Sequence, residues 1–201
     1  MKQASVIVPR EAQERLERFA ALLFDWASTL NLISKNDRGA IWDRHIADCL
    51  QLVPLIKPGI DRGIDMGSGG GFPGLVLALA TGISFDLIES DRRKAAFLRE
   101  AVRATGARAR VHAARVESVG LPPAKLVTAR ALAHLPKLLC LSAPHLAPDG
   151  HCLFMKGTSV DAELTDAAKQ WHMRAERFPS QTAQGSVILR ISELSRAASA
   201  A

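Results

Sequence analysis

The sequence contains no tyrosine, and aromatic residues make up only 5% of its 201 residues. This scarcity argues against a broad aromatic platform on which single-stranded bases could stack. No apolar run approaches the ~20 residues of a membrane-spanning helix, and residues 1–10 contain no apolar signal-peptide core. We therefore expect no membrane association and a cytoplasmic location, with frayed ends at the first few residues and in the Ser/Ala-rich tail.

Cysteine is also scarce, since Cys49, Cys140 and Cys152 are the only three and lie far apart in the chain. No C-x-x-C, H-x-x-x-H or H-E-x-x-H pattern is present. The sequence therefore predicts neither a disulfide framework nor a metal site. We expect the three thiols to be buried or partly buried.

The charge is unevenly distributed. The net charge is +6, but residues 91–115 carry eight basic side chains against two acidic ones, namely Arg92, Arg93, Lys94, Arg99, Arg103, Arg108, Arg110 and Arg115 against Asp91 and Glu100. Helical spacing places Arg92, Arg99 and Arg103 on one face, which would suit a phosphate backbone. A solvated helix face is the ordinary alternative.

Hydrophobic periodicity predicts two segments of different character. An apolar stripe predicts a helix over residues 10–31, followed by a loop at 34–39 and a second helix at 41–55. From residue 62 to about 171, strands alternate with helices, as in a doubly wound parallel sheet. We expect strands at 63–66, 85–89, 109–113, 125–129 and 151–155, helices at 74–80, 91–105, 135–143 and 160–171, and a hairpin of 173–178 and 186–191.

This alternation predicts an α/β fold with a seven-stranded, mostly parallel sheet that ends in an antiparallel hairpin. We divide the chain into an N-terminal helical extension (1–60), a ligand-binding domain (61–194) and a flexible tail (195–201). Ligands in such sheets bind beyond the carboxyl ends of the strands, where the strand order reverses. Candidate site residues should therefore follow these strands.

A glycine-rich loop, DMGSGGGFPG, follows the first expected strand at residues 65–74. Gly69, Gly71 and Gly74 match the dinucleotide pattern G-x-G-x-x-G, whereas Asp65 with Gly67, Gly69 and Gly71 matches the acid-x-G-x-G-x-G loop of S-adenosylmethionine sites. The glycine at the end of the strand is Gly67. When the dinucleotide pattern is counted from Gly67, its third glycine falls on Phe72, so the pattern is not met there. The acid also repels a pyrophosphate and suits a cationic sulfonium, so we favour S-adenosylmethionine.

Glu89 stands at the end of the second expected strand. A carboxylate at this position can accept hydrogen bonds from the ribose hydroxyls of a nucleoside. Both candidate cofactors contain such a ribose, so Glu89 supports a nucleoside site without deciding between them.

The glycine loop resembles the D-[VI]-G-[TS]-G-x-G-[FL]-P-G loop of the bacterial RsmG (GidB) methyltransferases. Five further segments match in order: Leu30–Ser34 with N-L-[TI]-[SA], Arg44–Cys49 with R-H-[IL]-x-D-S, Arg115–Glu117 with [SG]-R-[VA]-E, Ala129–Ala131 with S-R-A, and Met155–Gly157 with L-K-G. Ala129 and Cys49 stand where the family usually has serine. The resemblance covers residues 20 to 193.

The resemblance implies a Rossmann-like class I methyltransferase fold and methyl transfer from S-adenosylmethionine to N7 of a guanine in 16S ribosomal RNA. It also implies which residues bind the cofactor, namely Gly67, Phe72, Val116, Glu117 and Arg130. By position, Arg44 and His45 lie near the catalytic cleft, and Lys156 is expected to meet RNA phosphate or base. The partner implied is 16S ribosomal RNA within a small-subunit assembly intermediate, and we expect the enzyme to be a monomer.

The residues agree with such a reaction. Guanine N7 carries a lone pair and no proton, so its methylation needs orientation rather than a general base. The polar-Pro-Pro-aromatic motif of exocyclic amine methyltransferases is absent after the fourth expected strand, and no cysteine stands at a strand end to attack a pyrimidine. The alternatives are a small NAD-dependent oxidoreductase and a non-catalytic RNA-binding module of the same fold.

Overall fold

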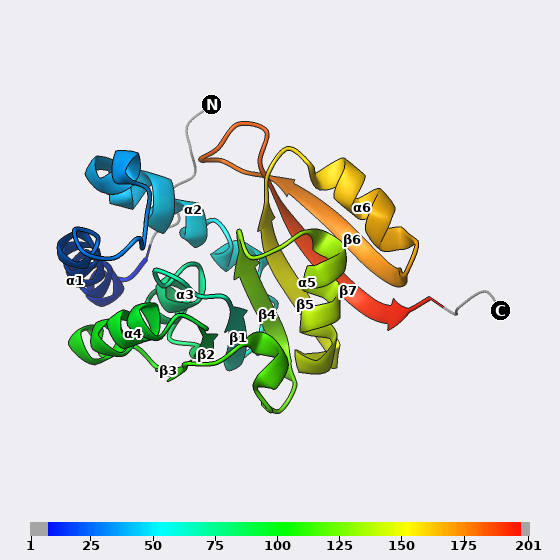
Figure 1. Ribbon diagram of the computed structural model, residues 1–201, viewed down its shortest axis with the longest axis horizontal. Coiled ribbons are helices and arrows are strands. Elements are labelled where there is room, and N and C mark those ends of the chain that lie inside the picture. The colour runs from blue at the N-terminus through cyan, green and yellow to red at the C-terminus, as the bar shows by residue number, and fades with distance from the viewer. Residues whose placement is uncertain (1–7, 198–201) are drawn as a thin grey trace.

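A seven-stranded sheet forms the centre of the molecule in the computed structural model, which describes residues 8–197 (Figure 1). The strand order is β3-β2-β1-β4-β5-β7-β6. The first five strands are parallel, and β7 runs antiparallel between β5 and β6. The strands are β1 (Arg62–Met66), β2 (Ser84–Ile88), β3 (Ala109–His112), β4 (Ala124–Arg130), β5 (Leu146–Lys156), β6 (Trp171–Pro179) and β7 (Val187–Arg196). The predicted fold is confirmed.

Helices cover both faces of the sheet, and two apolar clusters lie between the layers. The helices are α1 (Arg10–Trp26), α2 (Ala47–Leu50), α3 (Gly74–Thr81), α4 (Arg92–Thr105), α5 (Leu135–Ser142) and α6 (Val160–Ala168). The cluster under α1, α3 and α4 receives Phe85, Leu126 and Leu153 from the sheet. The cluster under α5 and α6 receives Val127 and Phe154. Neighbouring strand residues thus point to opposite cores, as the pleat requires.

The N-terminal segment shares the first core with the rest of the chain. Leu16, Phe19 and Leu23 of α1 are buried, and the Phe19 ring packs on Phe72 and Phe97, with ring centroids 5.7 and 6.4 Å away. Helix α1 therefore packs over α3 and α4 and forms part of the same core as the sheet.

Helix boundaries in the N-terminal segment differ from the prediction. Helix α1 ends at Trp26 rather than residue 31, because the hydroxyls of Ser28 and Thr29 donate to main-chain carbonyls of the last turn. The expected loop at 34–39 is a 3₁₀ helix, Lys35–Ala40.

The expected helix at 41–55 is also divided. It consists of a π-helix (Trp42–Ile46), α2 and a 3₁₀ turn (Val53–Leu55). Pro54 has no N–H to donate to a preceding carbonyl, so the α-helix cannot continue through it.

The C-terminal part contains more strand than predicted. Helix α6 ends at Ala168, and Trp171, expected to end that helix, begins β6. Strand β7 continues through Arg196, two residues into the segment expected to be a flexible tail. The expected fraying of the first few residues and of 198–201 lies outside the described residues.

The expected burial of the thiols is confirmed for two of the three cysteines. Cys49 and Cys152 are buried, but Cys140 is exposed because it lies on the outward face of α5. The Arg196 guanidinium donates to its sulfur at 3.7 Å. Within residues 8–197, no helix is long and apolar enough to cross a membrane, and no cluster of His, Cys, Asp or Glu could hold a metal ion.

We predict that Gly74→Ala lowers the free energy of unfolding by about 1–3 kcal/mol. An added Cβ would lie 2.4 Å from the Cβ of Asp65 in the adjoining strand, so helix α3 would have to move away from β1. Urea unfolding measures the change. Gly120→Ala is the matched control, since nothing lies within 4 Å of its added Cβ. Equal stability of the two variants would contradict the close contact.

Candidate functional site

The loop between β1 and α3 forms a tight turn that only glycine tolerates. Gly67, Gly69 and Gly71 have φ of 67°, 54° and 95°, in the left-handed region. The Ser68 amide donates to the Ile88 carbonyl at 3.0 Å, and the Ser68 carbonyl accepts from the Gly71 and Phe72 amides. A Cβ on Gly67 would lie 2.6 Å from the Leu132 side chain. The predicted glycine turn is thus present, and it is held to the end of β2.

A pocket of about 180 Å³ opens beside this turn, beyond the carboxyl ends of β1 to β4. It lies where the strand order reverses between β1 and β4. It is lined by Gly67, Ile88, Ser90, Ala114, Arg115, Val116, Glu117, Leu132, Ala133, Lys137 and Leu141. Three of the predicted cofactor residues, Gly67, Val116 and Glu117, therefore meet at one pocket. The ion pair of Glu117 with Lys137 (3.2 Å) closes one side of it.

Glu89 lies at the base of the loop and is 7% exposed. Its carboxylate accepts the Gly69 amide at 2.8 Å through one oxygen and the Asp91 amide at 2.7 Å through the other. Each carboxylate oxygen has a second lone pair, so the group can still accept from a ligand hydroxyl. Glu89 thus positions the glycine turn, in addition to the sugar contact predicted for it.

Asp65 lies beneath the loop rather than in the pocket, and it is fully buried. Its Oδ1 accepts the Thr128 hydroxyl at 2.6 Å, and its Oδ2 has no hydrogen-bond partner among the described residues. Burial raises the pKa of Asp65 to about 6, although hydrogen bonding from Thr128 works in the opposite direction. The position of Asp65 suits a role in supporting the loop.

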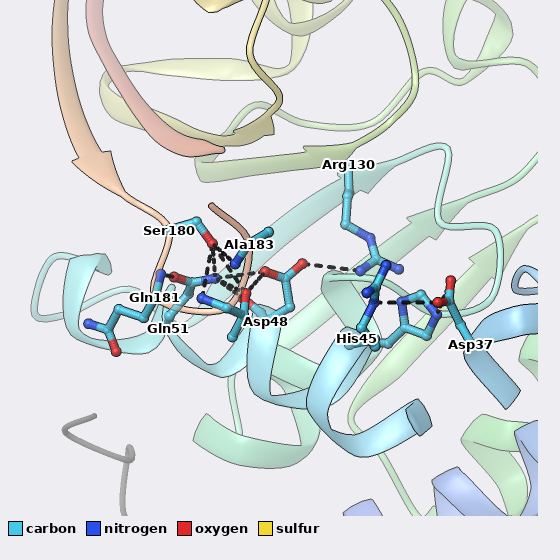
Figure 2. A network of polar contacts seen from close by, with 10 residues as sticks. Asp37, His45, Asp48, Gln51, Arg130, Ser180, Gln181 and Ala183 are labelled. Atoms are coloured by element: carbon cyan, nitrogen blue, oxygen red, sulfur yellow. Dashed lines mark hydrogen bonds and ion pairs between the residues drawn. The ribbon is translucent and has the colours of Figure 1, made fainter. Parts of the chain in front are cut away.

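Arg130 and Phe72 form a second group of predicted residues, on the other side of the β4 end. The Arg130 guanidinium stacks over the Phe72 ring at 4.5 Å from the centroid. Its Nη1 lies 3.3 Å from Oδ2 of Asp48, and Figure 2 shows this ion pair. Phe72 is only 4% exposed, so it acts as a platform beneath Arg130. Neither residue lines the pocket beside Gly67.

Arg44 and His45 lie on the π-helix, a rare form that often occurs at functional sites. The His45 ring packs on Phe72 with centroids 5.1 Å apart, and neither ring nitrogen makes a hydrogen bond within the described chain. Burial, followed by the charge of Arg130, lowers the pKa of His45. Asp37 lies near both, at 3.4 Å from Arg44 Nε and 3.6 Å from His45 Nε2.

Lys156 is held in place rather than free. Its Nζ lies 2.6 Å from Oε2 of Glu163 and donates to the Ala133 carbonyl at 3.0 Å. Burial would raise the pKa of Glu163, but hydrogen bonds from Lys156, Ser159 and the Leu135 amide outweigh it and lower that pKa. Lys156 therefore helps to position the loop after β4.

Two further pockets flank Arg130. One of about 290 Å³ is lined by Asp48, Gln51, Arg130, Ala131, Met155, Lys156, Gly157, Ser159, Glu163, Ser180, Ala183, Ser186, Val187 and Ile188. The other, of about 390 Å³, is lined by Asp37, Arg44, His45, Asp48, Arg130, Thr182, Ala183 and Gln184. The predicted residues Arg44, His45, Arg130 and Lys156 thus line one or the other of these pockets, which share Asp48, Arg130 and Ala183 and are together called the cleft below. The sequence did not single out Asp48, Gln51 or Glu163, although Asp48 lies in the segment that resembles R-H-[IL]-x-D-S.

The strand order and the position of the glycine-turn pocket define a Rossmann-like fold of the kind that class I methyltransferases have. Solved structures agree on the fold. A ribosomal protein L11 methylase from Lactobacillus delbrueckii subsp. bulgaricus has a TM-score of 0.58 at 15% identity, covering 73% of this chain and 76% of that one. A mutant of MtNAS in complex with S-adenosylmethionine has a TM-score of 0.59 at 13% identity, covering 90% and 75%.

The chain belongs to the GidB family, rRNA small subunit methyltransferase G, whose model matches residues 12–187. A protein of this name from Acidiphilium cryptum is 56% identical over 98% of this chain and 92% of its own length. One from Gluconobacter oxydans is 52% identical over 94% and 97%. These relatives are methyltransferases, so the comparison does not favour the alternative of an NAD-dependent oxidoreductase.

We predict a pH dependence of stability that Asp65→Asn removes. The folded-state pKa of Asp65 is raised to about 6, against about 3.9 in an unfolded chain. The carboxyl therefore stabilises the fold fully below pH ~4, and this contribution is lost as the pH rises through 6. The variant should gain about 2–3 kcal/mol relative to the parent protein between pH ~4 and ~8.

Urea unfolding across this pH range tests the shift. The informative quantity is the change with pH in the difference in unfolding free energy between variant and parent. The size of that difference at one pH is not informative, because the asparagine amide adds a contribution that does not vary with pH. Asp149→Asn is the control: hydrogen bonding from Lys125 lowers the pKa of this exposed carboxyl, which is therefore ionised in the folded and unfolded states over most of this pH range, so the variant should show almost no trend. A stability difference for Asp65→Asn that stays flat with pH would show that Asp65 is not perturbed.

Proposed function

We propose that this protein transfers a methyl group from S-adenosylmethionine to N7 of a guanine in small-subunit ribosomal RNA. The observation that carries the proposal is the glycine turn with its pocket at the reversal of strand order, in a chain of the GidB family. The names of the relatives identify small-subunit ribosomal RNA as their substrate, and we extend this substrate to the present chain.

Gly67, Val116 and Glu117 would hold the nucleoside part of S-adenosylmethionine in the pocket beside the turn, with Glu89 accepting from its ribose. Gly67 and Leu132 both line the pocket, and a Cβ at Gly67 would collide with Leu132, so the pocket keeps this lining only with glycine at that position, where the backbone can approach a ligand closely. When bound, S-adenosylmethionine supplies an electrophilic methyl group on a sulfonium. We assign Arg130, on its Phe72 platform, to the methionine end of this site.

The chain's own residues would mainly orient the target base and exclude water. Guanine N7 presents a lone pair in the plane of the ring and has no proton to lose. The reaction therefore needs no general base, and the cleft residues are consistent with this. Arg130 and Lys156 are engaged in ion pairs, and the lowered pKa of His45 favours its uncharged form. We assign Arg44, His45 and Lys156 to contact with the RNA or to the positioning of its target base.

Helix α4 would supply attraction for RNA. Arg92 and Arg99 are exposed on this helix, as is Arg103, which pairs with Glu100 at 2.6 Å. The apolar face of the helix, with Phe97, Leu98 and Ala101, is buried on the sheet. Exposed arginines on a well-packed helix suit the sequence-independent part of RNA binding. We further propose that the enzyme acts as a monomer in the cytoplasm, on 16S ribosomal RNA within a partly assembled small subunit.

We predict that cells without this gene lack one 7-methylguanosine in small-subunit ribosomal RNA, as measured by mass spectrometry. The intact gene should restore it, and the Gly67→Asp variant should not, because a charged side chain would enter the cofactor pocket. Titration with adenosylhomocysteine should show no binding to that variant. Gly120→Asp is the control in an open loop and should behave like the parent protein.

Unchanged 7-methylguanosine after gene removal would refute the substrate. A non-catalytic RNA-binding module would in addition show no affinity of the parent protein for adenosylhomocysteine.

We predict that the double variant Arg92→Glu/Arg99→Glu weakens RNA binding by at least tenfold at low salt and makes log Kd less dependent on log salt concentration. Its affinity for adenosylhomocysteine should stay within twofold, because neither side chain lines the cofactor pocket. Lys57→Glu/Lys125→Glu makes the same change in net charge at exposed positions outside that pocket. Equal losses in both double variants would mean that net charge, and not helix α4, attracts the RNA.

A further inference from the structure

The segment 180–186, which joins β6 to β7, lies against the N-terminal part of the chain. The Ser180 amide donates to the Ser186 carbonyl at 2.9 Å, and the Ser180 hydroxyl accepts the Thr182 and Ala183 amides at 3.3 and 3.1 Å. The segment is thus closed on itself by local hydrogen bonds. In Figure 2 it runs directly beside the helical turn that carries Asp48 and Gln51.

Two side chains of the N-terminal part hold this segment in place. Gln51, which is 6% exposed, accepts the Gln181 amide at 2.9 Å and donates to Oδ1 of Asp48 at 2.8 Å. The Thr182 hydroxyl donates to the same Asp48 oxygen. Since these residues lie about 130 positions apart in the chain, the contacts fix the segment relative to the body of the protein.

The same carboxylate also holds Arg130. One oxygen of Asp48 accepts from Gln51 and Thr182, and the other accepts from Arg130 at 3.3 Å. The Asp48 and Arg130 side chains are only 15% and 19% exposed, so their charges compensate each other in a partly buried place. The position of the segment is thereby linked to that of Arg130.

The backbone after β4 sends consecutive side chains to two different pockets. Arg130 and Ala131 line the pocket of about 290 Å³, whereas Leu132 and Ala133 line the cofactor pocket. Ala131 adopts a φ of 52°, which is rare for a residue with a Cβ and is often found at functional sites. The two pockets are therefore neighbours that share this strand end.

We propose that the pocket of about 290 Å³ receives the target base, that segment 180–186 is its outer wall, and that Gln51 and Asp48 are positioning residues that hold this wall. Methyltransferases that act on a base extrude it into a pocket and recognise it by hydrogen bonds. Ser180 and Ser186 of the wall line this pocket together with Lys156 and Ser159, and the Ser186 side chain is the one of these four that makes no hydrogen bond within residues 8–197. This inference rests on the proposed function, because it places the RNA base of that reaction.

The test separates positioning of the base from binding of cofactor or RNA. Gln51→Ala should lower kcat for methylation of small-subunit RNA at least tenfold, because the base is no longer held against the cofactor. The KM for RNA should stay within threefold, since α4 supplies the attraction, and the Kd for adenosylhomocysteine within twofold. Hydrogen exchange of the Gln181 amide should become faster while the β1 and β4 amides keep their protection.

Thr182→Val is the second variant, which keeps the side-chain shape and removes the hydroxyl donated to Asp48. It should lower kcat in the same way although Gln51, which donates to the Thr182 hydroxyl at 3.2 Å, remains in the chain and keeps its bond to the Gln181 amide. Gln170→Ala, an exposed glutamine beyond α6, is the matched control and should leave every value unchanged.

The possible failures are distinguishable. A parent protein that binds adenosylhomocysteine yet methylates no small-subunit RNA refutes the proposed function. If the parent protein is active and the variants keep its kcat although their Gln181 amide exchanges faster, segment 180–186 does not act as a wall for the base. If both variants lose tenfold in affinity for adenosylhomocysteine, the contacts of Gln51, Asp48 and Thr182 position the cofactor rather than the base, and the inference is wrong.

Discussion

The close contact between helix α3 and strand β1 is the constraint on which the site depends. Gly74 lies directly on the side chain of buried Asp65, and no larger residue fits there. The chain must therefore reverse within the few residues from Gly67 to Phe72, which accounts for three glycines in the left-handed region. The same short turn places the Phe72 ring between Phe19 in the core and Arg130 in the cleft. Packing in the core and the position of a charged site residue are thus consequences of one contact.

The sequence predicted those features that local pattern determines. Alternating strands and helices predicted the sheet, with each predicted strand overlapping an observed one. The glycine turn and the carboxylate of Glu89 were recognisable because strand ends and tight turns have local signatures. The exposed arginines of α4 followed from helical spacing. Helices in the N-terminal part were predicted less well, since periodicity alone does not distinguish a continuous helix from the π-, α- and 3₁₀-helical pieces observed at 42–55.

The sequence could not predict contacts that depend on where distant segments meet. The ion pair of Lys156 with Glu163 of α6, at 2.6 Å, is one such contact. Two charges in a place this poorly exposed are stable only when they are paired and hydrogen-bonded. The network of Gln51 with Gln181 likewise joins two segments that carry no shared pattern. Phe72 was placed at the cofactor by resemblance, and its burial under Arg130 emerges only from the fold.

The ion pairs of the cleft allow attraction of RNA and positioning of the site side chains to depend on different charges. Arg130 is compensated by Asp48 and Lys156 by Glu163, so the cleft itself contributes little net positive charge. Under the proposed function, long-range attraction for a phosphate backbone would come from the exposed arginines of α4, where solvent and salt screen it. Paired charges in the cleft keep fixed positions because each has a partner, and fixed positions are what an in-line transfer to a base requires. On this proposal, exposed charge would serve affinity for RNA and compensated charge would fix the geometry of the site.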